Sequence, residues 1–70
     1  MTARTRDPEA TREAILDAAE EAFLTKGFAE TSTAFIARRA GVTKSLIHHH
    51  FGSKEALWDE VKVRRFSIYS

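Results

Sequence analysis

Apolar residues in the first third of the chain recur at spacings of three and four, the period of an amphipathic helix. They are Ile15, Ala18, Ala19, Ala22 and Phe23. Asp7 followed by Pro8 is typical of a helix start, with the carboxylate as N-cap and proline at the first helical position. Lys26 and Gly27 predict the helix end, with Gly27 left-handed and Phe28 packing behind it as an apolar plug. The pattern predicts a structural helix.

A second, short helix follows. The hydroxyl groups of Thr31–Thr33 are candidate caps, and the helix is expected to run to about Ala40. Its inward face consists of Ile36, Ala37 and Ala40. Arg38 and Arg39 point away from that face, and Gly41 ends the helix.

A tight turn and a third helix come next. Val42 is predicted to be a buried turn residue, and Thr43 to cap a helix of about residues 44–50. Ile47 and Phe51, four residues apart, are its expected anchors in the core. Two short helices joined by a glycine-containing turn form a helix-turn-helix.

The last segment predicts a fourth helix. Gly52 breaks the third helix, Ser53 is the N-cap of the next, and Glu55 lies in its first turn. One apolar stripe consists of Leu57, Val61 and Ile68, and an adjacent one of Trp58, Phe66 and Tyr69. No segment has the alternation of a strand, so the predicted fold class is all-α: three helices plus the start of a fourth.

Composition narrows the class of protein. The 70 residues suffice for one small domain, and 43% apolar with 30% charged residues is ordinary for a folded soluble protein. Without cysteine there is no disulfide framework and no thiolate zinc site. No apolar run approaches the roughly 20 residues of a membrane span, and residues 1–7 lack the apolar core of a signal peptide. We expect a soluble, cytoplasmic chain with no membrane partner.

Charge is segregated along the chain although the net charge is only +1. Residues 7–30 hold seven acidic and two basic residues, whereas residues 31–54 hold four basic and no acidic ones. A basic face on an acidic scaffold suits a polyanionic ligand, because its field steers the encounter. The alternative is an ordinary solvated run of charges.

The residues at many of these positions match a known family. The matching segments are Thr11–Ala19, Phe23, Lys26–Phe28, Thr31–Ser32, Ile36–Ala37, Ala40–Lys44, His49, Phe51 and Ser53–Leu57. Together they resemble the DNA-binding head of the tetracycline-repressor-like (TetR) family of bacterial transcription regulators. The resemblance covers about residues 9–61, and it rests on many positions in fixed order.

The resemblance implies a homodimeric regulator, usually a repressor, that places the third helix in the major groove of a palindromic operator. It also implies a larger C-terminal helical domain that dimerises and binds a small-molecule inducer. We therefore expect a flexible arm over residues 1–7, the DNA-binding domain over residues 8–61, and a fourth helix over residues 54–70. That helix would lead toward the missing C-terminal domain of a longer protein, since its apolar surface exceeds what a three-helix head can bury.

Seven residues are candidates for contact with double-stranded DNA. They are Thr33, Thr43, Lys44, Ser45, His48, His49 and Lys54. Lys44, Ser45, His48 and His49 can share one side of the third helix, where lysine and serine bond base edges. Thr33 and Thr43 stand at helix N-termini, which bind phosphate readily. Lys54 matches a family position that contacts phosphate. The alternative is that these seven residues are ordinary capping and polar residues on a solvated surface.

The three consecutive histidines have two possible roles. Adjacent helical residues diverge by about 100°, so His48, His49 and His50 do not close on one metal ion. The family commonly has tyrosine at positions 48 and 50, and a histidine there would bind phosphate more strongly when protonated. Operator affinity should then rise as pH falls from about 7.5 to about 6. For His50, a hydrogen bond to the backbone is an equally good interpretation.

Some positions depart from the family pattern. Ala34 stands where some members have a base-reading arginine, so base reading should shift almost wholly to the third helix. Phe35 replaces a usually polar residue, and its exposed ring is unexplained unless it packs on Leu46. Leu46 could instead touch thymine methyl groups. Arg4 and Arg6 could reach DNA as an arm, or belong to a disordered tail.

Two other classes of function are alternatives to DNA binding. A protein-interaction module that has lost DNA binding is favoured slightly by Ala34, Phe35 and the histidines. An enzyme is not supported, because no nucleophile and base stand at a workable spacing and no phosphate-binding loop is present. The sequence predicts no catalytic residue, no cofactor and no metal site.

Overall fold

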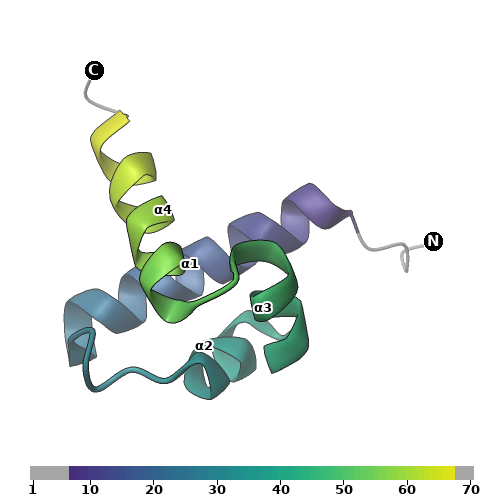
Figure 1. The fold of residues 1–70 in the computed structure, drawn as a ribbon, viewed down its shortest axis with the longest axis horizontal. Coiled ribbons are helices and arrows are strands. Elements are labelled where there is room, and N and C mark those ends of the chain that lie inside the picture. Colours follow the sequence, from purple (N-terminus) through teal and green to yellow (C-terminus); the bar gives the residue numbers. More distant parts are fainter. Residues whose placement is uncertain (1–6, 68–70) are drawn as a thin grey trace.

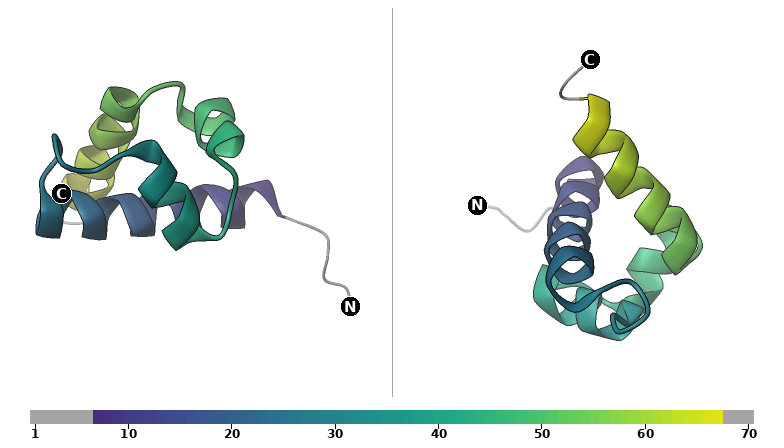
Figure 2. Two further views of the ribbon diagram at one scale, coloured as in Figure 1. Left: turned by 90° about the horizontal axis from the view of Figure 1, so that it is seen from below. Right: turned by 90° about the vertical axis from the view of Figure 1, so that its left-hand side faces the viewer.

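The computed structural model describes residues 7–67, which form four helices and no strand. They are α1 (Pro8–Lys26), α2 (Thr33–Ala40), α3 (Lys44–Phe51) and α4 (Lys54–Ser67). α1 is the longest and forms the base on which the other three pack (Figure 1). α2 and α3 lie at one end, while α4 starts beside α1 and rises away from the body (Figures 1 and 2). The all-α prediction is confirmed, whereas the expectations for Arg4, Arg6, Ile68 and Tyr69 lie outside the described residues.

The start of α1 is as predicted, but its end differs in one respect. The Asp7 side chain accepts a hydrogen bond from the backbone N–H of Glu9 at 3.1 Å, and Pro8 opens the helix. Gly27 has the predicted positive φ of 96°, yet its ψ of 152° is extended rather than left-handed helical. The chain must turn sharply away from α1 there, so the left-handed prediction for Gly27 was wrong.

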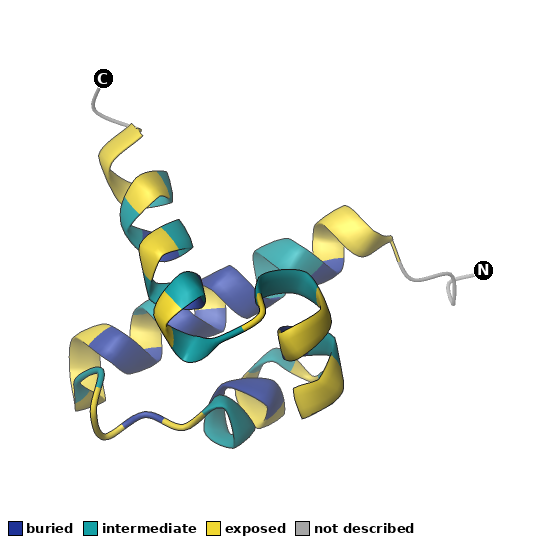
Figure 3. Cartoon of the chain, in the orientation of Figure 1, coloured by how far each residue is buried: buried dark blue, intermediate teal, exposed yellow. Residues whose placement is uncertain are grey.

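All four helices contribute to one core. Its large, fully buried side chains are Ile15 and Leu16 of α1, Ile36 of α2, Ile47 of α3, and Leu57 and Val61 of α4. The buried positions recur along α1 and alternate with half-buried and exposed ones (Figure 3). Each such side chain contributes about 1.5–3 kcal/mol by leaving water. The stripe predicted for α1 is buried throughout, and Leu16, which was not assigned to it, is buried as well.

An aromatic cluster closes the core where α1 ends and α4 begins. Phe23 lies 5.3 Å from Phe28 and 5.1 Å from Trp58, measured between ring centroids, and the second pair meets edge to face. These are favourable geometries for aromatic pairs. Phe28 is therefore half-buried in the role predicted for it.

Thr31 does not cap α2. Its side chain is buried, and Oγ1 lies 2.7 Å from the carbonyl oxygen of Gly27 and 3.2 Å from that of Ala22. The cap is Ser32, whose Oγ accepts from the backbone N–H of Phe35 at 3.0 Å. Thr31 instead ties the loop back to the end of α1, where helix carbonyls lack partners within the helix.

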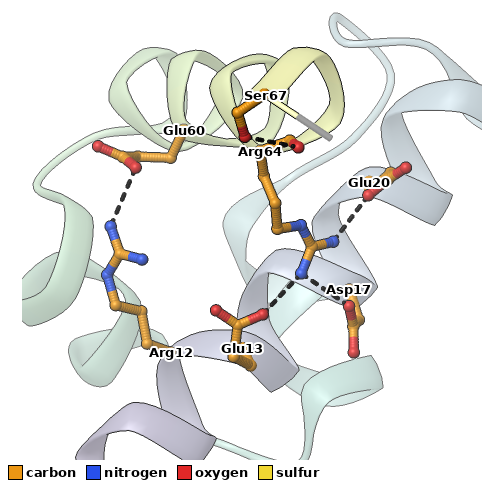
Figure 4. A network of polar contacts seen from close by, with 7 residues as sticks. All are labelled: Arg12, Glu13, Asp17, Glu20, Glu60, Arg64 and Ser67. Carbon is orange, nitrogen blue, oxygen red and sulfur yellow. Dashed lines mark hydrogen bonds and ion pairs between the residues drawn. The ribbon is translucent and has the colours of Figure 1, made fainter. Parts of the chain in front are cut away.

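Ion pairs hold α4 against α1 on the outer side of the core. The Arg64 guanidinium, which extends from α4, contacts carboxylates on successive turns of α1 (Figure 4). They are Glu13 at 2.9 Å, Asp17 at 2.9 Å and Glu20 at 2.7 Å. Donation from Arg64, and then from Arg65, holds the pKa of the Glu20 carboxyl below its usual value. Arg12 adds a second link, to Glu60 at 3.0 Å.

Candidate nucleic-acid interface

α2 and α3 are joined by the three residues 41–43. Gly41 is left-handed, with φ 75° and ψ 30°, a conformation that glycine adopts without strain. Its N–H donates to the carbonyl of Arg38, and the N–H of Val42 donates to the carbonyl of Ala37 at 3.0 Å. Val42 packs on the core half-buried, rather than fully buried as predicted. This turn fixes the direction in which α3 leaves α2.

α3 presents a polar surface around a single buried anchor. Thr43 caps it as predicted, because Oγ1 accepts from the N–H of Leu46 at 3.2 Å. Ile47 is buried, and Phe51 packs half-buried against the core. The four polar candidates are all exposed: Lys44, Ser45, His48 and His49. The fold therefore gathers these candidates on one short helix and leaves them available for contact.

The two threonine candidates stand at neighbouring helix starts. Thr33 is the first residue of α2 and is half-buried, and Thr43 is the exposed cap of α3. In both helices the free backbone N–H groups of the first turn accompany these side chains. One N–H group of each first turn is engaged by the cap, that of Phe35 by Ser32 and that of Leu46 by Thr43.

The His48 ring is held against the end of its own helix. Its Nδ1 lies 3.1 Å from the carbonyl oxygen of Gly52, while the N–H of Gly52 donates to the carbonyl of His48 at 2.9 Å. The backbone contact considered for His50 is thus made by His48. The His50 ring is half-buried, and its centroid lies 6.2 Å from that of Phe51.

Lys54 reaches inward as well as lying next to the Ser53 cap. Its Nζ donates to the carbonyl oxygens of Phe28 at 2.9 Å and Thr31 at 3.0 Å, and it lies 4.2 Å from the centre of the Phe28 ring. An ammonium group has three N–H donors, so two of them are used within the fold. Sequence reasoning missed this structural role, because no local pattern relates residue 54 to residues 28 and 31.

The ring of Phe35 is not exposed as expected. It is half-buried against the core, and Lys26 Nζ at the end of α1 lies 4.1 Å from its centroid. Arg38 and Arg39 each lie 5.8 Å from the same centroid. Cation–π contacts with these three cations therefore explain the aromatic ring at position 35.

A small cavity beside Phe35 has a volume of about 60 Å³. It is lined by Ala18, Glu21, Ala22, Thr25, Phe35 and Arg39. Ligand pockets for small organic molecules are typically about 300–1,000 Å³, so this cavity is too small for one. Among residues 7–67, no three His, Cys, Asp or Glu side chains are grouped to hold a metal ion, and no helix is long and apolar enough to cross a membrane.

Four acidic side chains of α1 are paired within the fold. Glu13, Asp17 and Glu20 pair with α4, and Glu21 pairs with Arg39 at 3.4 Å. Residues 31–54, which contain no acid, keep Arg38 and Lys44 exposed. The α2–α3 side is thus the basic side of the molecule.

A capped short helix with an exposed basic and polar surface, following a tight turn, defines the helix-turn-helix class of DNA-binding domain. The model of a protein family described as bacterial regulatory proteins, tetR family, matches residues 15–61. The chain belongs to this family of regulatory proteins. The resemblance stated from the sequence is therefore confirmed.

Known proteins are similar to the chain over most of its length. The HTH-type transcriptional regulator TtgR of Pseudomonas putida is 45% identical over 58 residues, which are 81% of this chain and 28% of TtgR. AcrR of Shigella flexneri is 39% identical over 56 residues, 80% of this chain and 26% of AcrR. The HTH-type transcriptional repressor BepR of Brucella suis biovar 1 is 43% identical over 51 residues, 73% of this chain and 24% of BepR.

The chain spans about a quarter of the length of these relatives. No solved structure matches it significantly.

Proposed function

We propose that the chain is the DNA-binding head of a homodimeric, cytoplasmic transcription repressor that inserts α3 into the major groove of a palindromic operator. The observation that carries this proposal is the row of exposed polar side chains on α3, held outward by the buried Ile47. The repressor assignment rests on the family and on BepR, whose name describes a repressor.

The candidate residues divide by the part of DNA they would contact. Lys44, Ser45 and His49 read base edges, where each good contact contributes about 1–3 kcal/mol of discrimination. The remaining four bind the phosphate backbone and fix the position of α3: Thr33, Thr43, His48 and Lys54. Ala34 offers no donor, so the reading of sequence rests on α3.

Dimerisation and inducer binding would belong to a further domain beyond α4. The relatives are about four times as long as the matched segment, which leaves room for such a domain. In the dimer, two copies of α3 would lie about 34–36 Å apart in successive major grooves. One head alone gives up the avidity of two half-sites and should bind weakly.

The experiment measures binding of the 70-residue chain to a random-sequence duplex of 30 base pairs at several salt concentrations. We expect the affinity to fall steeply as salt rises, because bound Lys and Arg release counterions from DNA. Lys44→Gln should weaken binding. Lys62→Gln is the matched control and should leave it unchanged, since Lys62 lies on α4 and pairs with Asp59.

Selection of bound duplexes from a random library would then give the preferred half-site. Absence of duplex binding even at low salt would refute the proposal, and it would favour the protein-interaction module considered from the sequence. Equal effects of the two lysine substitutions would show that α3 is not the contact surface.

A further inference from the structure

His48 is exposed on α3, and one of its two ring nitrogens is within hydrogen-bond distance of the backbone. Nδ1 lies 3.1 Å from the carbonyl oxygen of Gly52. A carbonyl oxygen only accepts hydrogen bonds, so this contact requires the proton on Nδ1. The other nitrogen, Nε2, belongs to an exposed residue on the polar surface of α3.

This contact determines what Nε2 can do in each protonation state. In the neutral ring only one nitrogen carries a proton, and the carbonyl of Gly52 requires it on Nδ1. Nε2 is then a bare acceptor, which repels phosphate oxygens and guanine acceptors alike. In the imidazolium both nitrogens carry protons, and Nε2 becomes a charged donor.

We propose that His48 binds an acceptor atom of DNA only as the imidazolium, so that DNA binding by this chain takes up one proton at His48. The inference rests on the proposed function. It adds that His48, through Nε2, is the histidine that makes DNA affinity depend on pH. His50 differs from His48 in that its ring is half-buried and lies beside Phe51. His49 reads bases in the proposed function and is not tied to the backbone.

Several charged groups around α3 already have partners within the fold, so we expect the acceptor for His48 Nε2 to come from DNA. On α3 itself, Lys44 lies one turn before His48, and His49 and His50 follow it. The ionisable groups of the elements packed around α3 are Arg38 and Arg39 of α2, Lys54, Glu55, Asp59, Glu60, Lys62, Arg64 and Arg65 of α4, and Arg12 of α1, which lies over the Phe51 ring. Arg12 and Glu60 pair with each other, Arg39 pairs with Glu21, and Lys54 donates to two carbonyls. The hydrogen-bond partner of His48 within residues 7–67 is the carbonyl of Gly52.

The test compares dissociation constants for the random 30-base-pair duplex at pH 6.0 and pH 7.5, at constant low salt. The unmodified chain should bind several-fold more weakly at pH 7.5, and by no more than tenfold per pH unit, because one proton is linked. His48→Gln supplies an amide donor at both pH values and should abolish most of this difference. His50→Gln is the matched control and should retain it.

A second readout requires no DNA. Nitrogen-15 NMR of the neutral ring at pH 8 should place the His48 proton on Nδ1, and a proton on Nε2 would overturn the inference. Equal affinities of the unmodified chain at the two pH values would overturn it while leaving the DNA-binding proposal intact. Retention of the full pH effect in His48→Gln would do the same, whereas absence of duplex binding at either pH would refute both.

Discussion

Lys54 of α4 and Phe28 of the α1–α2 loop are joined twice. The Lys54 ammonium donates to the Phe28 carbonyl oxygen at 2.9 Å and lies 4.2 Å from the centre of its ring. A residue matched to a phosphate-binding position therefore also fastens the start of α4 to the segment that leads into α2. The orientation of the helix-turn-helix on the scaffold depends on this link.

Replacing Lys54 with methionine keeps the aliphatic stem on Phe28 but removes the ammonium. We expect the free energy of unfolding to fall by about 1–3 kcal/mol, because two half-buried carbonyls lose charged donors. Affinity for all DNA sequences should fall together. If the third N–H binds phosphate, the slope of log affinity against log salt should also decrease by about 0.9.

Lys62→Met, which removes a lysine from the same helix, serves as the control and should change neither quantity by much. If DNA affinity falls but the slope of log affinity against log salt is unchanged, Lys54 only positions the helix-turn-helix and does not bind phosphate. Unchanged stability would contradict the structural role described here.

Ser45 and His49 should determine which sequence is preferred. Ser45→Ala or His49→Asn should cost about 1–3 kcal/mol of discrimination at one or two positions of the half-site, since base-edge donors are lost or moved. The measurement is selection of duplexes from a random library, followed by comparison of the enriched sequences. A uniform loss of affinity with the same enriched sequence would contradict the division between base and phosphate contacts.

Gly41 and Gly27 should respond differently to asparagine. A Cβ atom at either position would meet no atom within 4 Å, so the cost of substitution is conformational. Gly41 is in the left-handed region, which asparagine visits, so Gly41→Asn should be milder than Gly41→Ala, which costs about 1–2 kcal/mol. Gly27, with ψ 152°, lies in a region reserved for glycine, and both substitutions should cost about 1–3 kcal/mol. Urea unfolding measures all four, and equal effects of Asn and Ala at Gly41 would contradict this assignment.

The Glu20 carboxyl should make stability depend on acid pH. Its pKa in the folded chain is lowered from the ordinary value of 4.5 by donation from Arg64 and Arg65. A lowered folded-state pKa contributes stability that is fully present above pH 4.5 and is lost as pH falls through the folded value. Glu20→Gln should therefore destabilise the chain by about 1 kcal/mol at pH 7, and this difference should shrink below pH 4.5.

Urea unfolding at pH 7 and at pH 3 checks this linkage. Glu30→Gln, at an exposed position of the α1–α2 loop, is the control and should have little effect at either pH. A difference between Glu20→Gln and the unmodified chain that stays constant with pH would rule out the linkage.

Local signals predicted most of the fold. Caps at Asp7, Thr43 and Ser53 act over two or three residues, and the apolar periodicity acts within single helices, so both are visible in the sequence. The exposed row on α3 could be predicted for the same reason. The failures concern contacts that depend on how the helices cross. Of the three candidate caps of α2, Ser32 is the cap and Thr31 bonds the end of α1 instead, and Phe35 meets Lys26 only because α1 ends beside α2.

The Arg64 cluster was missed for a related reason. Each acidic residue of α1 had an ordinary interpretation as solvated charge, and nothing local associates residue 64 with positions 13, 17 and 20. Only the packing angle of α4 on α1 brings them together. The protonation chemistry of His48 also depends on the backbone at Gly52, which a residue pattern does not specify.

α3 is attached to the core by the buried Ile47 and the half-buried Phe51, while Thr43 caps its first turn. Most of its remaining positions are outside the core, so they can be exchanged without rebuilding the domain. In the proposed function, a new operator preference can therefore be acquired by substitutions at the base-reading positions 44, 45 and 49, while the rest of the domain stays unchanged. Substitutions that change the preferred DNA sequence then need not affect the stability of the fold.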